Sequence, residues 1–166
     1  MNKPAVHDAA EGVAKVDLET RLTEQHHLAL RTWLRMLSTT VKIETEIRTR
    51  LRNHFDITLP RFDLMAQLER HPKGLRMGEL SKRMMVTSGN ITGIADQLEK
   101  EGLVTRVVDQ NDRRSYSLKL TRAGLATFKK MAQVHEMWVG ELLDGLEPEQ
   151  QHNLLQLLSK VKARLS

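Results

Sequence analysis

The sequence predicts a mainly α-helical fold that carries one small β-hairpin. Apolar residues recur at the three- and four-residue spacing of amphipathic helices through most of the 166-residue chain. Only the segment 103–121 alternates polar with apolar residues, on either side of the turn-forming "QNDR". With 40% apolar and 28% charged residues, the composition is that of an ordinary globular protein.

The N-terminal part of the chain predicts a flexible arm followed by a long helix. Residues 1–20 are small and polar and lack the apolar core of a signal peptide. From about Leu18 to Asn53 neither proline nor glycine occurs, so we expect one long helix or two helices with a bend. A further helix begins with Pro60 in its first turn and stops near "HPKG".

Two short helical segments follow and predict a helix-turn-helix. The first runs from Gly78 to Met85, and Thr87 or Ser88 caps the second. Gly102 ends the second helix as a left-handed cap. Its inward-facing residues are Ile91, Ile94, Ala95 and Leu98.

The strands "LVTRVVD" and "RSYSLKLT" form a hairpin directly after the second helix, in the position of a wing. Thr121 then caps a long helix that Gly145 ends, and Pro148 lies in the first turn of the last helix. The apolar stripe of that last helix is Leu154, Leu158, Val161 and Leu165. We therefore expect a winged helix-turn-helix DNA-binding domain at 57–121, flanked by a helical dimerisation region at 21–56 and 122–166.

The terminal helices carry more apolar surface than a 166-residue core needs. Pairing with a second copy would bury that surface. A two-fold dimer would also place two second helices roughly 34 Å apart, so that both enter successive major grooves of double-stranded DNA.

Charge supports a polyanionic partner. The net charge is +5, and residues 57–124 hold twelve basic and eight acidic residues.

The outer face of the second helix is small and polar, which lets a helix enter a groove, and Asn90 can pair with an adenine edge. Arg113 or Arg114 can reach a minor groove, with Asp112 orienting it. The residues expected to contact DNA are Thr87, Ser88, Gly89, Asn90, Thr92, Gly93, Arg106, Asp112, Arg113, Arg114 and Ser115. Taken singly, the helix face and the turn could be plain solvated surface.

With these segments in place, the chain from Arg31 to Leu165 resembles the MarR family of winged-helix transcriptional regulators. The resemblance rests on "TLPRFDLMAQLERHP", "ELSKRMMVTSGNITGIADQLEKEGLVTR" and "DQNDRRSYSLKLTRAG". The last stretch matches the family's wing signature at Asp112, Arg114, Leu120, Thr121 and Gly124. The resemblance implies a homodimer with interlocking terminal helices, a palindromic operator, usually repression, and a small-molecule pocket between the dimerisation helices and the winged-helix lobe.

The chain has no cysteine, so sensing of oxidants through a thiol is excluded, and an organic effector is the favoured signal. An aromatic carboxylate or its coenzyme A thioester is the class that the resemblance suggests. The residues expected to line its pocket are Arg31, Trp33, Arg35, Met36, Leu37, Thr40, Phe62 and Met65, although ordinary core is the favoured interpretation of Leu37 and Phe62. The basic residues between Arg31 and Arg52 could serve a polyanionic ligand or DNA phosphates.

Three other classes remain to be weighed. A non-specific architectural DNA binder would carry Lys and Arg on the outer face of the second helix, and residues 88–93 carry neither. A metal-responsive regulator would need cleaner ligand spacing than the vicinal His26 and His27 provide, so no metal site is expected. No nucleophile–base motif or glycine-rich phosphate loop is present, so we expect neither an enzyme nor a cofactor. Without an apolar run of spanning length, no membrane partner and a cytoplasmic location are expected.

Overall fold

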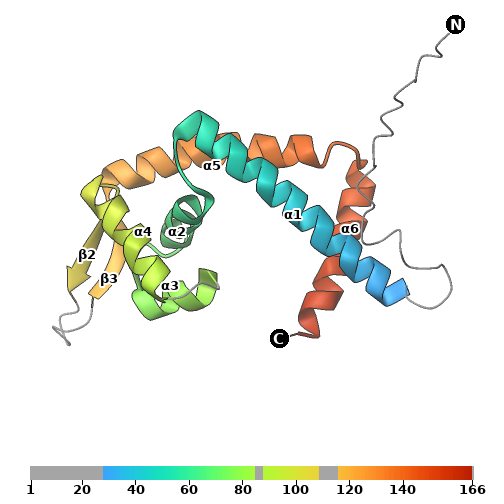
Figure 1. Cartoon of the computed structure of the whole chain (residues 1–166), viewed down its shortest axis with the longest axis horizontal. Helices are drawn as coiled ribbons and strands as arrows, with labels where there is room; N and C mark the ends of the chain where they lie inside the picture. Colours follow the sequence, from blue (N-terminus) through green and yellow to red (C-terminus); the bar gives the residue numbers. More distant parts are fainter. Residues whose placement is uncertain (1–27, 85–87, 109–115, 166) are drawn as a thin grey trace, which may run out of the picture. The chain divides into compact units, whose positions relative to one another are not determined.

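The computed structural model describes residues 28–84, 88–108 and 116–165. The chain divides into two compact units, 1–43 and 44–166, and the boundary falls within the first helix. The elements are α1 (Leu28–Phe55), α2 (Leu59–Glu69), β1 (Leu75–Arg76), α3 (Met77–Met84), α4 (Ser88–Lys100), β2 (Val104–Val108), β3 (Tyr116–Leu120), α5 (Arg122–Leu142) and α6 (Pro148–Ala163) (Figure 1). None of the helices in the described ranges has the length and apolarity needed to cross a membrane.

The described part of the first unit, residues 28–43, is the N-terminal half of α1, and none of its residues is buried. Apolar side chains stand in solvent there, with Trp33 55% and Val41 52% exposed. Helix α1 is a single helix, as one of the two predicted alternatives had it. Its predicted start near Leu18 lies outside the described residues.

The end of α1 depends on a left-handed residue that is not glycine. Asp56 has φ of +49°, and its N–H donates to the carbonyl of Arg52 at 3.1 Å. Ile57 follows, and its N–H reaches back to the carbonyl of Leu51 at 3.5 Å while its side chain is buried. Aspartate tolerates this backbone region better than most residues, so the helix can stop here and the chain can turn into α2. Pro60 stands in the first turn of α2, as predicted.

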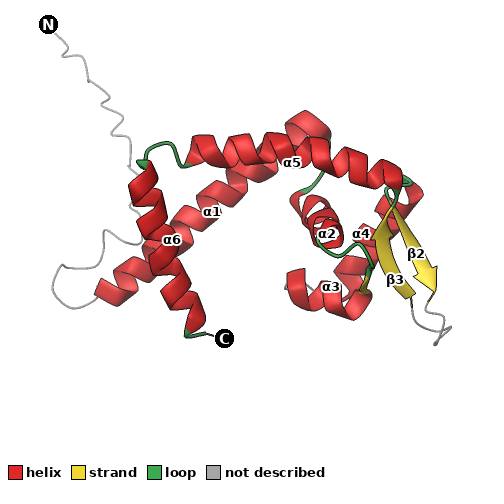
Figure 2. Ribbon diagram, turned by 180° about the vertical axis from the view of Figure 1, so that it is seen from behind, coloured by secondary structure: helices red, strands yellow, loops and turns green. Residues whose placement is uncertain are grey.

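The second unit holds the hydrophobic core, which α2 supplies most heavily. Phe62, Leu64, Met65 and Leu68 of α2 are all buried, because α2 packs against α3, α4, α5 and β3. The four residues predicted to face inward from α4 are also buried: Ile91, Ile94, Ala95 and Leu98. The helix-turn-helix prediction is therefore confirmed for the described residues of α3 and α4 (Figure 2).

The sheet has three strands, not the two that the sequence predicted. β1 pairs antiparallel with β3 through Leu75 and Leu118, and β2 pairs with the other edge of β3, which gives the order β1-β3-β2. A strand of two residues is too short to produce an alternating pattern, so β1 could not be recognised. The following helix begins at Met77, one residue before the predicted Gly78.

Hydrogen bonds at Gly102, Leu103 and Thr121 connect α4, β2 and α5. Gly102 adopts φ of +71°, and its N–H and that of Leu103 bond to the carbonyls of Glu99 and Leu98, which closes α4 as predicted. Thr121 caps α5, since its Oγ1 accepts from the N–H of Gly124 at 2.9 Å. The same hydroxyl donates to the carbonyl of Gly102 at 2.7 Å.

The C-terminal helices follow the prediction except at one boundary. Helix α5 ends at Leu142, before the expected Gly145, because Leu143 makes the capping turn through its N–H to the carbonyl of Gly140. Gly145 does not take up the left-handed conformation that a terminating glycine would use. Helix α6 begins with Pro148 and is exposed along its whole length.

Candidate nucleic-acid interface

The outer face of α4 is small, polar and open. Gly89, Asn90, Thr92 and Gly93 are all exposed. A Cβ added at Gly89 or Gly93 would meet no atom within 4 Å, so nothing else in the described structure occupies the space in front of the helix. Thr87 and the side chain of Ser88, also predicted to contact DNA, lie outside the described residues. This face can approach another surface closely and offers amide and hydroxyl groups to it.

Both strands of the predicted hairpin are present beside α4. β2 and β3 are paired from Val104 opposite Leu120 to Val108 opposite Tyr116. Helix α4 contacts β2, and Figure 2 shows the hairpin next to that helix. The tip residues predicted to contact DNA, Asp112, Arg113, Arg114 and Ser115, are outside the described residues.

Arg106 does not stand free as a DNA contact in this structure. Its guanidinium, on β2, forms ion pairs with Asp96 and Glu99 of α4, one through each terminal nitrogen. The backbone N–H of Arg106 also donates to Glu99 Oε1 at 3.2 Å. Only 26% of the side chain is exposed. Sequence reasoning missed this arrangement because the two carboxylates lie on a different element.

The aromatic ring of Tyr116 completes the surroundings of Arg106. The guanidinium carbon lies 5.3 Å from the ring centroid, at the distance of a cation–π contact. The hydrogen bond with Asp96 is the main influence that raises the pKa of Arg106 above its ordinary value. Residues from α4, β2 and β3 therefore meet around one permanently charged group.

A second arginine holds the same, C-terminal end of α4. Arg61 of α2 forms an ion pair with Glu101, just beyond the last turn of α4, and its side chain is only 14% exposed. The Nε atom of Arg61 is buried with no hydrogen-bond partner. The recognition-helix candidate is thus anchored by ion pairs to both α2 and β2.

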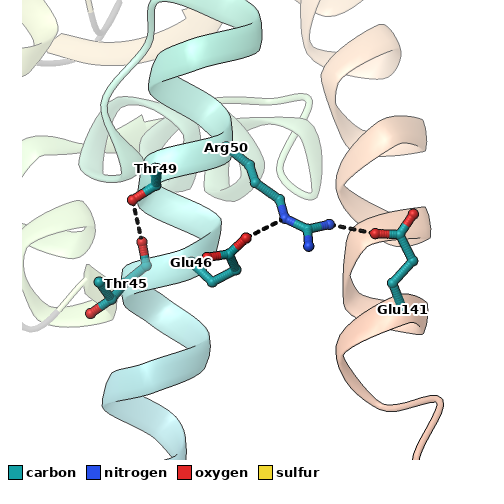
Figure 3. Close-up of polar contacts among 5 residues, drawn as sticks. All are labelled: Thr45, Glu46, Thr49, Arg50 and Glu141. Atoms are coloured by element: carbon teal, nitrogen blue, oxygen red, sulfur yellow. Dashed lines mark hydrogen bonds and ion pairs between the residues drawn. The ribbon is translucent and has the colours of Figure 1, made fainter.

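The C-terminal half of α1 is joined to α5 by a third arginine. Arg50 donates through Nε to Glu46 at 2.8 Å and through Nη1 to Glu141 of α5 at 2.5 Å, as Figure 3 shows. Its guanidinium carbon also lies 5.9 Å from the ring centroid of Trp138. The hydrogen bond with Glu46 is the largest cause of the raised pKa of Arg50. Residues 44–55 of α1 are in this way attached to α5.

The residues predicted to bind an effector are distributed over both units. Trp33 and Leu37 are 55% and 45% exposed in the first unit, where Arg35 and Thr40 are exposed and Arg31 and Met36 are half-buried. Phe62 and Met65 belong to the core of the second unit, and Met65 has no exposed surface. Phe62 also lines a cavity.

That cavity has a volume of about 330 Å³ and lies between α2, α3 and α5. Its lining residues are Phe62, Asp63, Ala66, Gln67, Arg70, Arg83, Met84 and His135. The rings of Phe62 and His135 are 4.8 Å apart. Of this group only Phe62 was predicted from the sequence, since the other residues are brought together by the packing of three helices.

Two ionisable groups of the cavity have shifted pKa values. Burial raises the pKa of the Asp63 carboxyl, with a smaller contribution from the charge of Glu44. Burial lowers the pKa of the His135 imidazole. Arg70 and Arg83 form no ion pair with any described residue. The cavity thus combines two available guanidinium groups with an aromatic wall and two groups whose charged forms are disfavoured.

A second cavity, of about 360 Å³, lies where α1 ends and α2 begins. Arg48 and Arg52 of the basic run contribute to its walls, together with Thr58 at the start of α2. No group of three His, Asp or Glu residues within the described ranges is arranged to hold a metal ion, and His26 and His27 lie outside those ranges.

Comparison with known proteins places these features among regulators of transcription. The model of the MarR family matches residues 57–116. The chain is 32% identical over 85 residues to the uncharacterized HTH-type transcriptional regulator YkoM of Bacillus subtilis, which covers 51% of this chain and 55% of that protein. The aligned part is thus about half the length of that relative.

Solved structures extend the similarity over most of the chain. A MarR family transcriptional regulator from Silicibacter pomeroyi has a TM-score of 0.71 and 33% identity, over 83% of this chain and 95% of that one. A mutant MarR from E. coli complexed with operator DNA has a TM-score of 0.67 and 27% identity, over 81% of this chain and 94% of that one.

Proposed function

Because the chain belongs to the MarR family, we propose that it regulates transcription by binding a palindromic operator as a homodimer, and that a small organic effector modulates this binding. Repression is the mode we propose, since a dimer seated on an operator blocks access to overlapping promoter DNA. Helix α4 would read the major groove, and the hairpin tip would reach the adjacent minor groove.

The observation that carries the proposal is the exposed small face of α4 beside the β2–β3 hairpin. Gly89 and Gly93 leave room for a base edge, and Asn90 and Thr92 supply the groups that can read it. No described residue from 88 to 99 is basic, so that face suits base reading better than general attraction to phosphates. A non-specific architectural protein would instead present basic residues on that face, to attract phosphates.

Two exposed apolar faces support the homodimer. Helix α6 has no buried residue, yet Leu155 and Leu157 are 63% and 59% exposed. Residues 28–43 of α1 expose apolar side chains as well. Contact with the same helices of a second copy would remove this area from water, which is the main driving force for such pairing. We therefore assign 21–56 and 122–166 to dimerisation and 57–121 to DNA binding.

The cavity between α2, α3 and α5 is the place we propose for the effector. Arg70 and Arg83 suit a carboxylate, and Phe62 with His135 suits a planar ring, so an aromatic carboxylate fits its lining. Because Arg83 and Met84 belong to α3, an occupied cavity can favour one placement of the helix-turn-helix over another. Such a ligand would weaken operator binding by its differential affinity for the two states.

Selection from a random pool of duplexes tests the DNA-binding function without knowledge of the operator. The full-length chain should enrich one palindromic site, and a gel shift should show a single retarded species of dimer stoichiometry. Equal affinity for the enriched and a scrambled duplex at matched salt would favour the architectural alternative.

The hairpin tip and the cavity are tested on the enriched duplex. Arg114→Ala should weaken binding at least tenfold, about 1.4 kcal/mol, while sedimentation still reports a dimer. Benzoate and salicylate, added as probe carboxylates, should release the DNA from the wild-type chain. Arg83→Gln should remove this response. Release that persists in Arg83→Gln would place the effector elsewhere.

A further inference from the structure

We infer that Arg106 is a positioning residue of the DNA-binding site, which holds the hairpin against the recognition helix through Asp96 and Glu99. On this inference its guanidinium contacts neither base nor phosphate. The inference rests on the proposed DNA-binding function and changes the role that the sequence suggested for this residue.

The geometry around Arg106 is that of an anchor. Each terminal nitrogen of the guanidinium meets a different carboxylate on α4, and Glu99 receives the backbone N–H of Arg106 as well. Tyr116 covers one side of the group from β3. One side chain therefore joins both strands of the hairpin to the C-terminal half of α4.

The chemistry favours arginine at this position. A planar fork can satisfy Asp96 and Glu99 at the same time, whereas a lysine ammonium is a point charge on a flexible stem. The pairing also neutralises the carboxylates nearest to the reading face of α4, which would otherwise repel DNA phosphates. Both terminal nitrogens of Arg106 are paired with carboxylates, and its side chain is 26% exposed. Few of its N–H donors are therefore available to a phosphate.

The functional consequence concerns alignment. Base reading by α4 and insertion of the hairpin tip require a fixed angle between the two elements, because small displacements misalign hydrogen bonds. A loosened hairpin should therefore reduce affinity for the specific site far more than affinity for unrelated DNA.

The first test substitutes Arg106→Lys and measures fluorescence anisotropy with the enriched and a scrambled duplex at several salt concentrations. We expect the affinity for the enriched duplex to fall at least tenfold, the affinity for the scrambled duplex to stay within twofold, and the salt dependence to be unchanged. The matched control Arg122→Lys, on an exposed residue of α5, should bind both duplexes like the wild type. Enriched-duplex affinity within twofold of the wild type would overturn the inference, since lysine preserves a phosphate contact.

The second test substitutes Glu99→Gln, which keeps Arg106 but removes one anchor. A direct DNA contact by Arg106 predicts equal or tighter binding, because the variant loses a negative charge and frees one terminal nitrogen of the guanidinium. Positioning predicts the opposite sign, a loss of about tenfold on the enriched duplex. The double variant Arg106→Lys/Glu99→Gln should lose no more than the weaker-binding single variant, and additive losses would contradict a shared role.

Hydrogen exchange separates this inference from the DNA-binding function itself. Glu99→Gln should speed exchange at β2 and β3 while α5 keeps its protection, whether or not DNA is present. Unchanged exchange in the hairpin would reject the anchor. If the wild-type chain enriches no duplex while the hairpin exchange does rise, the DNA-binding function fails and the anchor stands.

Discussion

At the scale of single residues, Gly124 shows how closely two segments can approach when a side chain is absent. It lies in the first turn of α5, against the backbone at the start of β2, where a Cβ would be 1.8 Å from the carbonyl oxygen of Leu103. No rotamer change can relieve that contact, because both partners are backbone. The wing signature at Thr121 and Gly124 is thus explained by packing and capping alone.

Gly124→Ala should therefore destabilise the fold by about 1–3 kcal/mol or more, through overpacking against backbone. Urea denaturation followed by circular dichroism measures this. Gly140→Ala, on the same helix, is the control: its Cβ would meet nothing within 4 Å, so alanine should raise stability by up to about 1 kcal/mol. Equal effects of the two substitutions would show that helix propensity, and not the contact with Leu103, decides the result.

His135 predicts a dependence of stability on pH. Burial lowers the pKa of its imidazole in the folded chain, so the unfolded chain binds the proton more readily. The stabilisation from this residue is present above about pH 6.5 and is lost as the pH falls through that value. Asp63 acts in the opposite direction at lower pH, because burial raises the pKa of its carboxyl.

The variant His135→Gln should accordingly lose less stability than the wild type between pH 7 and pH 5, measured as urea midpoints at each pH. His152→Gln, on exposed α6, should follow the wild-type curve. A His135→Gln curve parallel to that of the wild type would show that the imidazole charges without cost in the folded chain.

At the scale of elements, the helices could be predicted well because their periodicity is local. Core positions of α4 such as Ile91 and Leu98 were predicted from spacing alone, as was the capping role of Thr121. Two features were missed for physical reasons. Strand β1 is too short to have a pattern, and the partners of Arg106 are brought to it only by the packing of α4 on β2.

Helix α1 runs to Phe55 and stops at the left-handed Asp56. Asp56→Gly should raise stability by about 0.5–1 kcal/mol, since glycine adopts this conformation without strain. The exposed ion pair of Asp56 with Arg52, at 3.6 Å, contributes little that would be lost. Thermal melts should show Asp56→Ala shifted in the opposite direction, and a destabilised glycine variant would mean that the aspartate side chain outweighs its backbone strain.

At the scale of the whole molecule, the apolar residues of the terminal helices predicted a homodimer. They could not show which side chains would contact the second copy. The sequence identified a stripe along 154–165, and the structure leaves every residue of α6 in solvent. The lining of the cavity proposed for the effector was harder still to predict. The cavity between α2, α3 and α5 gathers Asp63, Arg83 and His135 from three helices, and no spacing along one helix contains that information.

The double variant Leu154→Glu/Leu158→Glu should convert the proposed dimer into a monomer, because two charges would replace apolar contacts one turn apart. Sedimentation velocity reports the change in mass, and affinity for a palindromic duplex should fall at least tenfold. Gln156→Glu adds charge to the same helix without removing an apolar side chain and should stay dimeric. A variant that remains dimeric would show that α6 is not part of the interface.

The junction at Thr121 makes the hairpin an exchangeable module. Its two ends are fixed to each other, since the N–H of Thr121 donates to the carbonyl of Leu103 at 3.0 Å and Val104 pairs with Leu120. Whatever chain is inserted between Val108 and Tyr116 therefore leaves the spacing of α4 and α5 unchanged. Tips of different length or charge can be grafted there, so reach along the DNA could be altered independently of the helix that reads it.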